Sequence, residues 1–240
     1  MVKNKPVYSF EEADSKKRML LGGKGSGLSE MTRLKLPVPV GFTITTEVCT
    51  KYYDNNKKLP KDVMPAVMKN IAKMEKKTGK KWNSIKNPLL VSVRSGAATS
   101  MPGMMDTILN LGLNEKTVEG LAEQTKNPRF SWDSYRRFIQ LFGKVVFGVK
   151  DEKFDYILDE VKKKQGIQDD SKLNVESLKT IVLEYKKICE KHTKRKFPDT
   201  PDEQLVLAIE AVFKSWMGER AIVYREKNNI TKDIANGTAV

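Results

Sequence analysis

The residues most able to do chemistry lie in the segment 91–114, which reads VSVRSGAATSMPGMMDTILNLGLN. Apolar and polar residues alternate up to Arg94, a pattern that predicts a half-buried strand ending there. The following residues, Ser95–Gly103, have almost no side-chain bulk, so their backbone N–H groups are open to a ligand. A fixed guanidinium beside bare N–H groups is one way in which proteins hold phosphate. The alternative interpretation is a long hairpin loop with an incidental arginine.

A second candidate is the glycine cluster at residues 22–27, which reads GGKGSG and is predicted to open a helix. Glycines at a helix N-terminus form an anion site, and Lys24 adds a mobile positive charge. The cluster does not match the P-loop pattern G-x-x-x-x-G-K-[ST]. It is not a dinucleotide-binding fingerprint either, because no suitable strand directly precedes it and no acidic residue follows at the expected place. A flexible glycine turn is the alternative.

Other chemically capable residues stand alone in the sequence. Asp106 could contact a metal or a ribose, or it could be an ordinary turn carboxylate that caps backbone N–H groups. His192 is the only histidine. It could carry a phosphoryl group or bind a metal, but its lysine-rich surroundings favour the exposed end of a helix. One histidine excludes a histidine-based metal cluster, and no nucleophile elbow supports Ser-His-Asp hydrolysis.

The chain is strongly basic, with 44 Lys and Arg against 30 Asp and Glu and a net charge of +14. A basic surface attracts nucleic acid, anionic membranes or phosphorylated ligands. The lysines are spread over many segments, which favours solvated helix faces, and no zinc-finger spacing, RNP-like aromatic motif or basic heptad is present. We therefore expect neither a nucleic-acid nor a membrane partner. The alternative is a free-standing basic module that binds nucleic acid or serves for interaction.

The length of 240 residues suits one large or two small domains. No apolar run approaches the roughly 20 residues that cross a bilayer, and the N-terminal residues lack the apolar region of a signal peptide. Cys49 and Cys189 are far apart and have no metal-type partners nearby. We expect two free thiols in a reducing compartment, the cytoplasm.

The N-terminal part of the sequence predicts mixed helices and strands. Strands are expected over Val7–Phe10, Gly41–Thr45, Leu89–Arg94 and Thr107–Leu111, with the last two paired. Helices are expected over Ser26–Leu34, with Leu28, Met31 and Leu34 on one face, then after a cap at Thr45 or Thr46, and over Pro60–Lys77, where Val63, Val67, Ile71 and Met74 have amphipathic spacing.

After Asn114 the sequence predicts only helices until the chain's last residues. They are expected over residues 115–126, 129–148, 151–165, 174–194, 201–217 and 219–229. Core residues are expected at Phe130, Trp132, Tyr135, Phe138, Ile139 and Phe142, and at Leu205, Ala208, Ile209, Val212 and Trp216. The final GTAV predicts the first residues of a strand, which indicates a fragment of a longer protein. We expect two subdomains, a mixed one of residues 1–112 with 199–240 and a helical one of residues 113–198.

Five blocks, in order, resemble the N-terminal end of pyruvate, phosphate dikinases. The blocks are LLGGKGSGLSEM (20–31), LPVPVGFTITTEVC (36–49), VSVRSGAATSMPGMMDTILNLGLN (91–114), NPRFSWDSYRRFIQLF (127–142) and FKSWMGERAIVYREKNNI (213–230). The resemblance implies an α+β fold, part of an ATP-grasp-like nucleotide-binding domain with a helical insert. In that family the domain uses ATP and inorganic phosphate to phosphorylate a histidine on a separate swivelling domain, releasing AMP and pyrophosphate. The phosphoryl group then passes to pyruvate on a barrel domain, giving phosphoenolpyruvate. From the resemblance we expect the parent enzyme to be a cytoplasmic homodimer.

The resemblance also implies roles for individual residues. Lys24 is similar to the family's ATP-binding lysine and Arg94 to its phosphate-binding arginine, and both are expected to act in catalysis. The loop over the phosphates is expected to use Met101, Gly103, Met104, Met105, Asp106 and Thr107. Arg220 is expected near the surface that faces the swivelling domain.

Several parts of the family pattern have no counterpart in this sequence. The acidic ligands of Mg²⁺ are expected mainly from a segment after Val240. The phosphohistidine motif and the barrel with its acid cysteine are absent, so His192, Cys49 and Cys189 do not take those roles. We expect an ATP-binding fragment that is not itself a competent phosphotransferase. A natural short homologue kept for interaction is the alternative, which an open reading frame continuing past Val240 would exclude.

Overall fold

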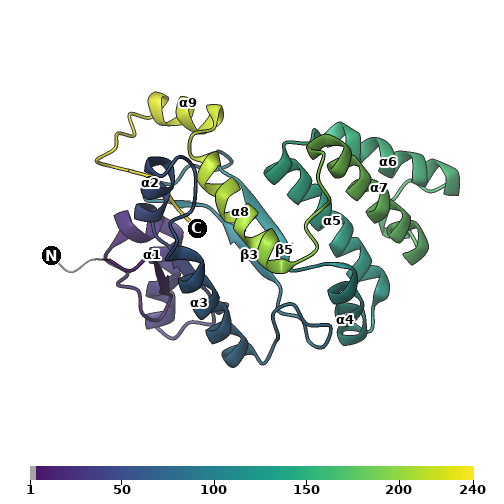
Figure 1. The fold of residues 1–240 in the computed structure, drawn as a ribbon, viewed down its shortest axis with the longest axis horizontal. Helices are drawn as coiled ribbons and strands as arrows, with labels where there is room; N and C mark the ends of the chain where they lie inside the picture. The colour runs from purple at the N-terminus through teal and green to yellow at the C-terminus, as the bar shows by residue number, and fades with distance from the viewer. Residues whose placement is uncertain (1–3) are drawn as a thin grey trace. The chain divides into compact units, whose positions relative to one another are not determined.

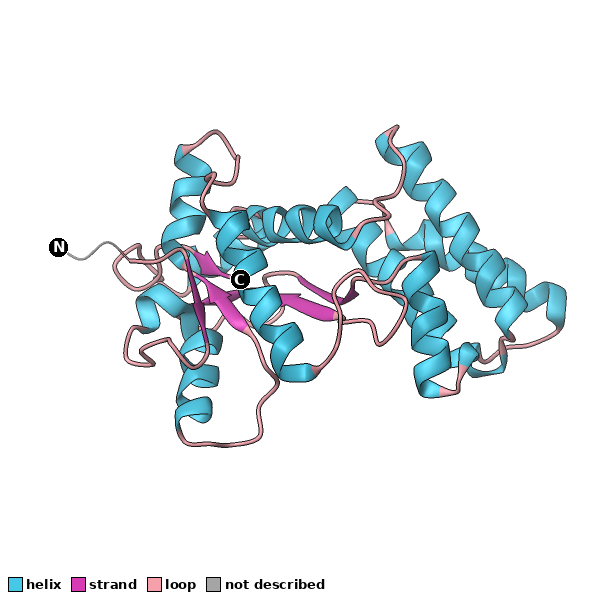
Figure 2. Ribbon diagram, turned by 60° about the horizontal axis from the view of Figure 1, so that its bottom comes forward, coloured by secondary structure: helices cyan, strands magenta, loops and turns pink. Residues whose placement is uncertain are grey.

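A computed structural model describes residues 4–240 of the chain (Figure 1). By their internal contacts these residues form two compact units. Unit 1 comprises residues 1–79, 93–107 and 209–240, and unit 2 comprises residues 80–92 and 108–208. The elements are mixed helix and strand (Figure 2), as the sequence predicts. The division into residues 1–112 with 199–240 and 113–198 stays a prediction.

Unit 1 is organised around short strands that come from distant parts of the sequence. Strand β1 (Val7–Ser9) pairs antiparallel with β2 (Phe42–Ile44), and β4 (Gly96–Ala97) pairs antiparallel with β6 (Thr238–Ala239). Ile44 and Val240 exchange backbone hydrogen bonds, with N–H···O distances of 2.7 and 3.0 Å. These bonds join the two pairs, so the C-terminal strand lies between β2 and β4.

The strands predicted at both ends of the chain are present, and a further strand had not been predicted. GTAV does begin a strand, and the predicted pair of β3 (Val91–Arg94) and β5 (Thr107–Leu111) is confirmed. Strand β4 falls in a segment that we expected to be loop throughout. Two small residues carry no strand pattern of their own, and β4 exists because β6 supplies its hydrogen-bonding partner.

The first helix, α1 (Arg18–Arg33), begins earlier than the predicted start at Ser26. Its regular geometry is interrupted at Gly22, where φ is 69° and ψ is 167°. The chain makes one turn before this break and resumes the helix immediately after it, so Gly23–Gly27 are helical rather than a leading loop. The prediction for Leu34 was also wrong, because the helix ends before it and its side chain is 55% exposed.

The other helices of unit 1 follow the predicted apolar spacing. Helix α3 (Val63–Thr78) buries all four residues assigned to its apolar face, and α2 (Thr46–Asp54) buries Val48 and Tyr52. The predicted threonine cap of α2 is wrong. Thr45 occupies the cap position but makes no capping hydrogen bond, and the Thr46 hydroxyl donates to the Met19 carbonyl instead.

Unit 2 is built from helices whose bounds lie close to the predicted ones. Three of them begin at an asparagine whose side chain accepts backbone N–H bonds, namely Asn114, Asn127 and Asn174. The helices are α4 (Glu115–Thr125), α5 (Pro128–Phe147), α6 (Asp151–Gln165) and α7 (Val175–Thr193), with the short η1 (Asp170–Lys172) before α7. Helix α5 packs against α4 and α7 through its buried aromatic residues. Phe130 is the exception to the predicted core, since it lies in the first turn of α5 and is 49% exposed.

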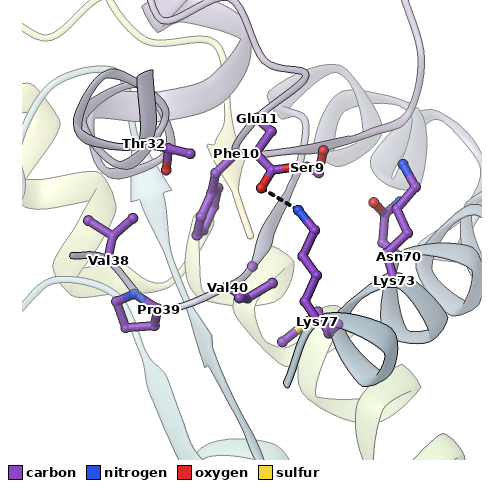
Figure 3. Close-up of a pocket in the computed structure, with 12 residues that line it drawn as sticks. Ser9, Phe10, Glu11, Thr32, Val38, Pro39, Val40, Asn70, Lys73 and Lys77 are labelled. Carbon is purple, nitrogen blue, oxygen red and sulfur yellow. Dashed lines mark ion pairs between the residues drawn. The ribbon is translucent and has the colours of Figure 1, made fainter. Parts of the chain in front are cut away.

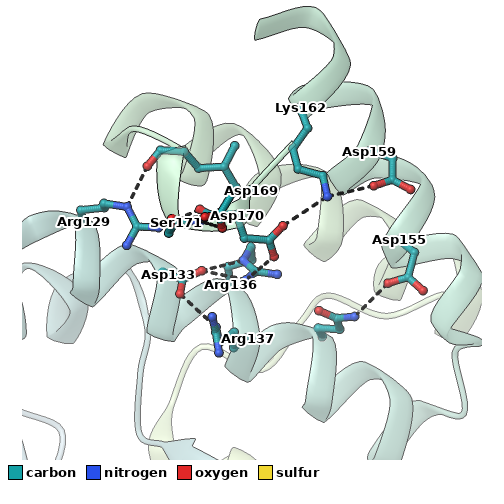
Figure 4. Close-up of polar contacts among 12 residues, drawn as sticks. Arg129, Asp133, Arg136, Arg137, Asp155, Asp159, Lys162, Asp169, Asp170 and Ser171 are labelled. Carbon is teal, nitrogen blue, oxygen red and sulfur yellow. Dashed lines mark hydrogen bonds and ion pairs between the residues drawn. The ribbon is translucent and has the colours of Figure 1, made fainter. Parts of the chain in front are cut away.

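A buried arginine joins the helices of unit 2 (Figure 4). Arg136 on α5 is 3% exposed, and its guanidinium donates to Asp133 Oδ1 at 2.8 and 2.9 Å and to Asp170 Oδ2 at 3.5 Å. Lys162 of α6 reaches the other oxygen of Asp170 at 3.2 Å. A buried charge is tolerated only when it is paired in this way, so these contacts fix η1 and α6 on α5.

Two further helices, α8 and α9, precede strand β6. Helix α8 (Pro201–Ser215) buries the predicted residues of its apolar face, including Leu205, Ile209 and Val212. Trp216 follows it, also buried, and the Arg225 guanidinium of α9 (Glu219–Lys227) lies 4.0 Å from the centre of its ring. Among residues 4–240, no helix is long and apolar enough to cross a membrane.

The break at Gly22 gives a first prediction. A Cβ at this position would lie 1.8 Å from the Gly96 carbonyl oxygen, and its φ and ψ belong to a region used almost only by glycine. We expect Gly22→Ala to lower the free energy of unfolding by about 3 kcal/mol or more. Gly27→Ala is the matched control, because a Cβ there meets nothing within 4 Å. It should stabilise the helix by about 0.5–1 kcal/mol. Urea unfolding followed by circular dichroism measures both, and equal midpoints would contradict the close approach.

The two cysteines give a second prediction, one for each unit. Both thiols are buried and free, and burial raises the pKa of Cys49 to about 11 and that of Cys189 to about 12. Because the thiolate is the nucleophile, we expect very slow labelling by an aromatic disulfide at pH 8. Labelling should reach both thiols in concentrated guanidinium chloride. Since folding favours the neutral thiols, their contribution to stability is lost as pH rises through these raised values. Fast labelling of either single-cysteine variant under native conditions would contradict its burial.

Candidate functional site

The candidate site is built where the backbone of α1 lies against the backbone of β4. Gly22 faces the Gly96 carbonyl, and the position of a Cβ on Gly96 would lie 3.6 Å from the Cβ of Lys24. Glycine is needed at Gly22, because any side chain there would separate the two segments, whereas a Cβ on Gly96 would make only an ordinary contact. The approach places the glycine-rich turns of α1 beside the start of the loop that follows β4.

Lys24 bridges the two segments. It lies on α1 two residues after the break, and its Nζ donates to the Ser95 carbonyl at 2.9 Å. Its pKa is lowered from the usual lysine range, first by burial and then by the positive charge of Arg94. The structure therefore brings together the two cations that the sequence singled out, although 70 residues separate them in the chain.

Arg94 stands at the end of β3, as predicted, and its side chain is exposed. Within residues 4–240, neither Arg94 nor Lys24 has a carboxylate within ion-pair distance. Two neighbouring like charges without a counter-charge repel one another, and an anion placed between them would relieve this repulsion. The arrangement is therefore electrostatically suited to phosphate.

The loop after β4 presents mainly its backbone. The Met101 side chain is buried at 6% exposure, and Met104 N–H donates to the Met101 carbonyl at 3.2 Å in a turn. Gly103 is exposed with φ of 74°, and a Cβ there would meet nothing within 4 Å. Met104 and Met105 are half-buried. The loop thus exposes backbone at Gly103 while Met101 anchors it.

The remaining predicted loop residues lie at its far end. Thr107 is half-buried and begins β5. Asp106 is also half-buried, and its Oδ1 lies 3.9 Å from Nη2 of Arg220 on α9. Arg220 was expected at a surface and is 72% exposed in its side chain. The partner of Asp106 seen here is thus a cation of the same chain.

Among the residues that the structure describes, His192 belongs to no cluster of metal-ligating side chains. His192 lies exposed in the last turn of α7. In the described part of the chain, no group of three or more His, Cys, Asp and Glu side chains could hold a metal ion.

A separate cavity of about 70 Å³ in unit 1 is lined by none of the predicted site residues (Figure 3). Its walls include Phe10, the segment Val38–Gly41 and the α3 residues Asn70 and Lys73. Ion pairs of Glu11 with Lys77 and of Glu12 with Lys73 lie on this side of unit 1. The lysines of this cavity are thus already neutralised, unlike Lys24 and Arg94.

The comparison with known proteins decides the family. The sequence matches the family described as pyruvate phosphate dikinase, AMP/ATP-binding domain, over residues 18–59 and 55–240. The chain belongs to this family. It is 53% identical to a pyruvate, phosphate dikinase of Entamoeba histolytica over 98% of the chain and 26% of that relative. The identities to those of Clostridium symbiosum and Giardia intestinalis are 49% and 48%, each over 98% of the chain and 27% of the relative.

The chain spans about a quarter of the length of the curated pyruvate, phosphate dikinases that it matches. The matched region begins at Arg18 and so includes both α1 and β4. Membership of the AMP/ATP-binding family supports ATP binding by this domain and confirms the resemblance inferred from the five sequence blocks.

One further cation lies at this candidate site and was not identified from the sequence. Arg18 begins α1, and its Nε–H donates to the Ala98 carbonyl at 2.8 Å, just beyond β4. It stands among basic residues, Lys16-Lys17-Arg18, that resemble any solvated charge run. Only the fold shows that this arginine reaches the end of β4 opposite to the one that Lys24 contacts.

The contact between the two cations gives a third prediction. We expect Arg94→Gln to raise the pKa of Lys24, because the neutral amide no longer disfavours a second positive charge. The rise should be incomplete, since burial is the larger cause of the lowered pKa. Carbon-13 NMR titration of labelled lysine Cε, assigned with Lys24→Arg, measures the effect. Arg195→Gln, in unit 2, is the matched control and should leave the pKa of Lys24 unchanged. An unaltered titration in Arg94→Gln would show that the two cations do not interact.

Proposed function

We propose that this chain forms the phosphate-binding part of an ATP site in a pyruvate, phosphate dikinase. The observation that supports it most directly is the pair of neighbouring cations, Lys24 and Arg94, beside a loop that offers exposed backbone. Membership of the AMP/ATP-binding family supports the same ligand.

Each residue then has a role set by its position. Arg94 presents its guanidinium from the end of a strand, so the planar fork can bind two phosphate oxygens. The Lys24 side chain is held by the bond from its Nζ to the Ser95 carbonyl, and it would supply a compact charge at the same anion. Backbone N–H groups of the loop that are not used in its own turn, such as those of Gly103 and Met105, would donate to the remaining oxygens. Phosphoryl transfer depends largely on such positioning and charge stabilisation.

The complete reaction belongs to the parent protein in this proposal. ATP, inorganic phosphate and pyruvate would give AMP, pyrophosphate and phosphoenolpyruvate by way of a phosphohistidine on another domain. The fold would be half of an ATP-grasp cleft, with the metal ligands outside residues 4–240. The isolated chain would then bind the nucleotide weakly and would not catalyse the reaction.

The fourth prediction tests the phosphate-binding pair by isothermal titration of Mg-ATP at moderate salt. We expect Arg94→Ala and Lys24→Ala each to weaken binding about tenfold or more, because each removes a charge-assisted contact. Arg195→Ala and Lys61→Ala remove the same charges from exposed positions elsewhere and should bind as the original chain does. Circular dichroism checks that all variants are folded.

Three outcomes would contradict this proposal or part of it. No heat at millimolar ATP from the folded original chain would show that residues 4–240 are not sufficient for the site. Equal weakening in all four variants would show a general charge effect. Tight, steeply salt-dependent binding of RNA that does not need Arg94 would favour the basic nucleic-acid module instead.

A further inference from the structure

We infer that Arg18 is a third phosphate-binding residue of this site and also positions its loop. The inference rests on the proposed function, and it names the part of the ligand that Arg18 would contact, a polyphosphate chain rather than the nucleoside. It follows from the place of Arg18 relative to β4, from the space around its guanidinium and from the charges near it.

Arg18 and Lys24 hold β4 from its two ends. Lys24 donates to the carbonyl of Ser95, the residue before β4, and Arg18 donates to the carbonyl of Ala98, the residue after it. Both cations come from α1, and they lie on the two sides of the break at Gly22. The residue that begins the loop is therefore fixed by a guanidinium, and a change at Arg18 should be felt along the loop.

The guanidinium of Arg18 lies close to the backbone of Gly23. A Cβ on Gly23 would be 3.3 Å from Nη2 of Arg18 and 3.4 Å from the Ala97 carbonyl oxygen. The absence of a side chain leaves room for the guanidinium to lie close to the helix backbone, next to the first turn after the break. The N–H groups of a helical turn that follows a break favour an anion.

Arg18 also retains donors that the protein does not use. The Nε–H bond to Ala98 engages one of the five N–H groups of an arginine. Within the described residues Arg18 forms no ion pair, and the same is true of Lys24 and Arg94. Some other arginines do form ion pairs, for example Arg33 with Glu30 and Arg137 with Asp133, whereas Arg129, Arg195 and Arg225 form none among the described residues. Arg18 and Lys24 lie at the two ends of β4, and Arg94 lies close enough to Lys24 to affect its pKa. Three cations in this region without a carboxylate partner match a ligand with several negative charges.

The ligand class follows from these donors. A guanidinium with free Nη groups binds oxygens of phosphate in a planar fork, and a lysine contributes a point charge. Three such groups exceed what a single phosphate monoester needs but suit consecutive phosphates. We therefore expect Arg18 to contribute to the affinity for a triphosphate and not to that for adenosine.

The fifth prediction tests Arg18 with inorganic triphosphate, adenosine and ATP as separate probes in calorimetric titrations. Arg18→Met should bind triphosphate and ATP about tenfold more weakly, with unchanged adenosine binding. Arg18→Lys keeps the charge but loses the planar fork of the guanidinium. Its affinity for triphosphate and ATP should lie between those of the original chain and Arg18→Met. Arg195→Met, an equal loss of charge in unit 2, should match the original chain. Hydrogen exchange of the amides of residues 98–107 should be faster in Arg18→Met and unchanged in Arg195→Met.

The outcomes separate this inference from the proposed function. If the original chain binds neither triphosphate nor ATP, the proposed function fails, and the binding role of Arg18 with it. If the original chain binds and Arg18→Met binds equally well, the proposed function stands and the role of Arg18 is overturned. If Arg18→Met does not fold, the folded Arg18→Lys variant tests the binding role instead. Undiminished triphosphate binding by this variant would show that the planar guanidinium is not needed and would overturn the inference. Unchanged hydrogen exchange in Arg18→Met overturns the positioning role.

Discussion

The structure of unit 1 depends on the approach of one bare backbone to another, at Gly22 and Gly96. A helix and a strand normally pack through side chains, which hold their backbones apart. Here the break in α1 removes even a Cβ from the contact, so the Gly96 carbonyl lies where the Cβ of any other residue at Gly22 would be. Two consequences follow. Long side chains of α1 reach past β4 to the carbonyls on either side of it, and the loop after β4 is held at a helical turn rich in glycine.

The same contact makes the end of the chain part of the site's support. Strand β6 pairs with β4 on one side, and Val240 pairs with Ile44 of β2 on the other. The Thr238 hydroxyl accepts the Gly96 N–H at 3.1 Å, so β6 holds the strand that carries the close approach through a side chain as well as through backbone pairing. Residues 142 positions apart thus cooperate in placing one peptide bond. The site is formed by tertiary structure and not by either sequence motif alone.

This dependence explains what the sequence could and could not predict. The alternation before Arg94 and the apolar spacing of α3 are local patterns, and they were sufficient to place β3 and α3. Strand β4 was missed because its two small residues become a strand only through β6. The start of α1 was misplaced because a glycine run suggests a turn, whereas a single glycine makes the break and the others continue the helix. Phe130 was assigned to the core from its periodicity alone, although the first turn of a helix often lies outside the packed layer.

The residues of the candidate site can be separated in the same way, into those that the sequence identified and those that only the fold shows. Lys24 and Arg94 were identified from residue type and from family resemblance, and the structure brings them close enough to affect one another. Their closeness has an electrostatic cost, because burial already disfavours the charged form of Lys24 and Arg94 adds repulsion. A fold that accepts this cost without supplying a carboxylate leaves the compensating charge to a ligand. Arg18 increases the positive charge further while it fixes the loop, so the contact that orders the backbone also concentrates charge beside it. In the proposed site, ordering the loop and attracting an anion would be two effects of the same side chains.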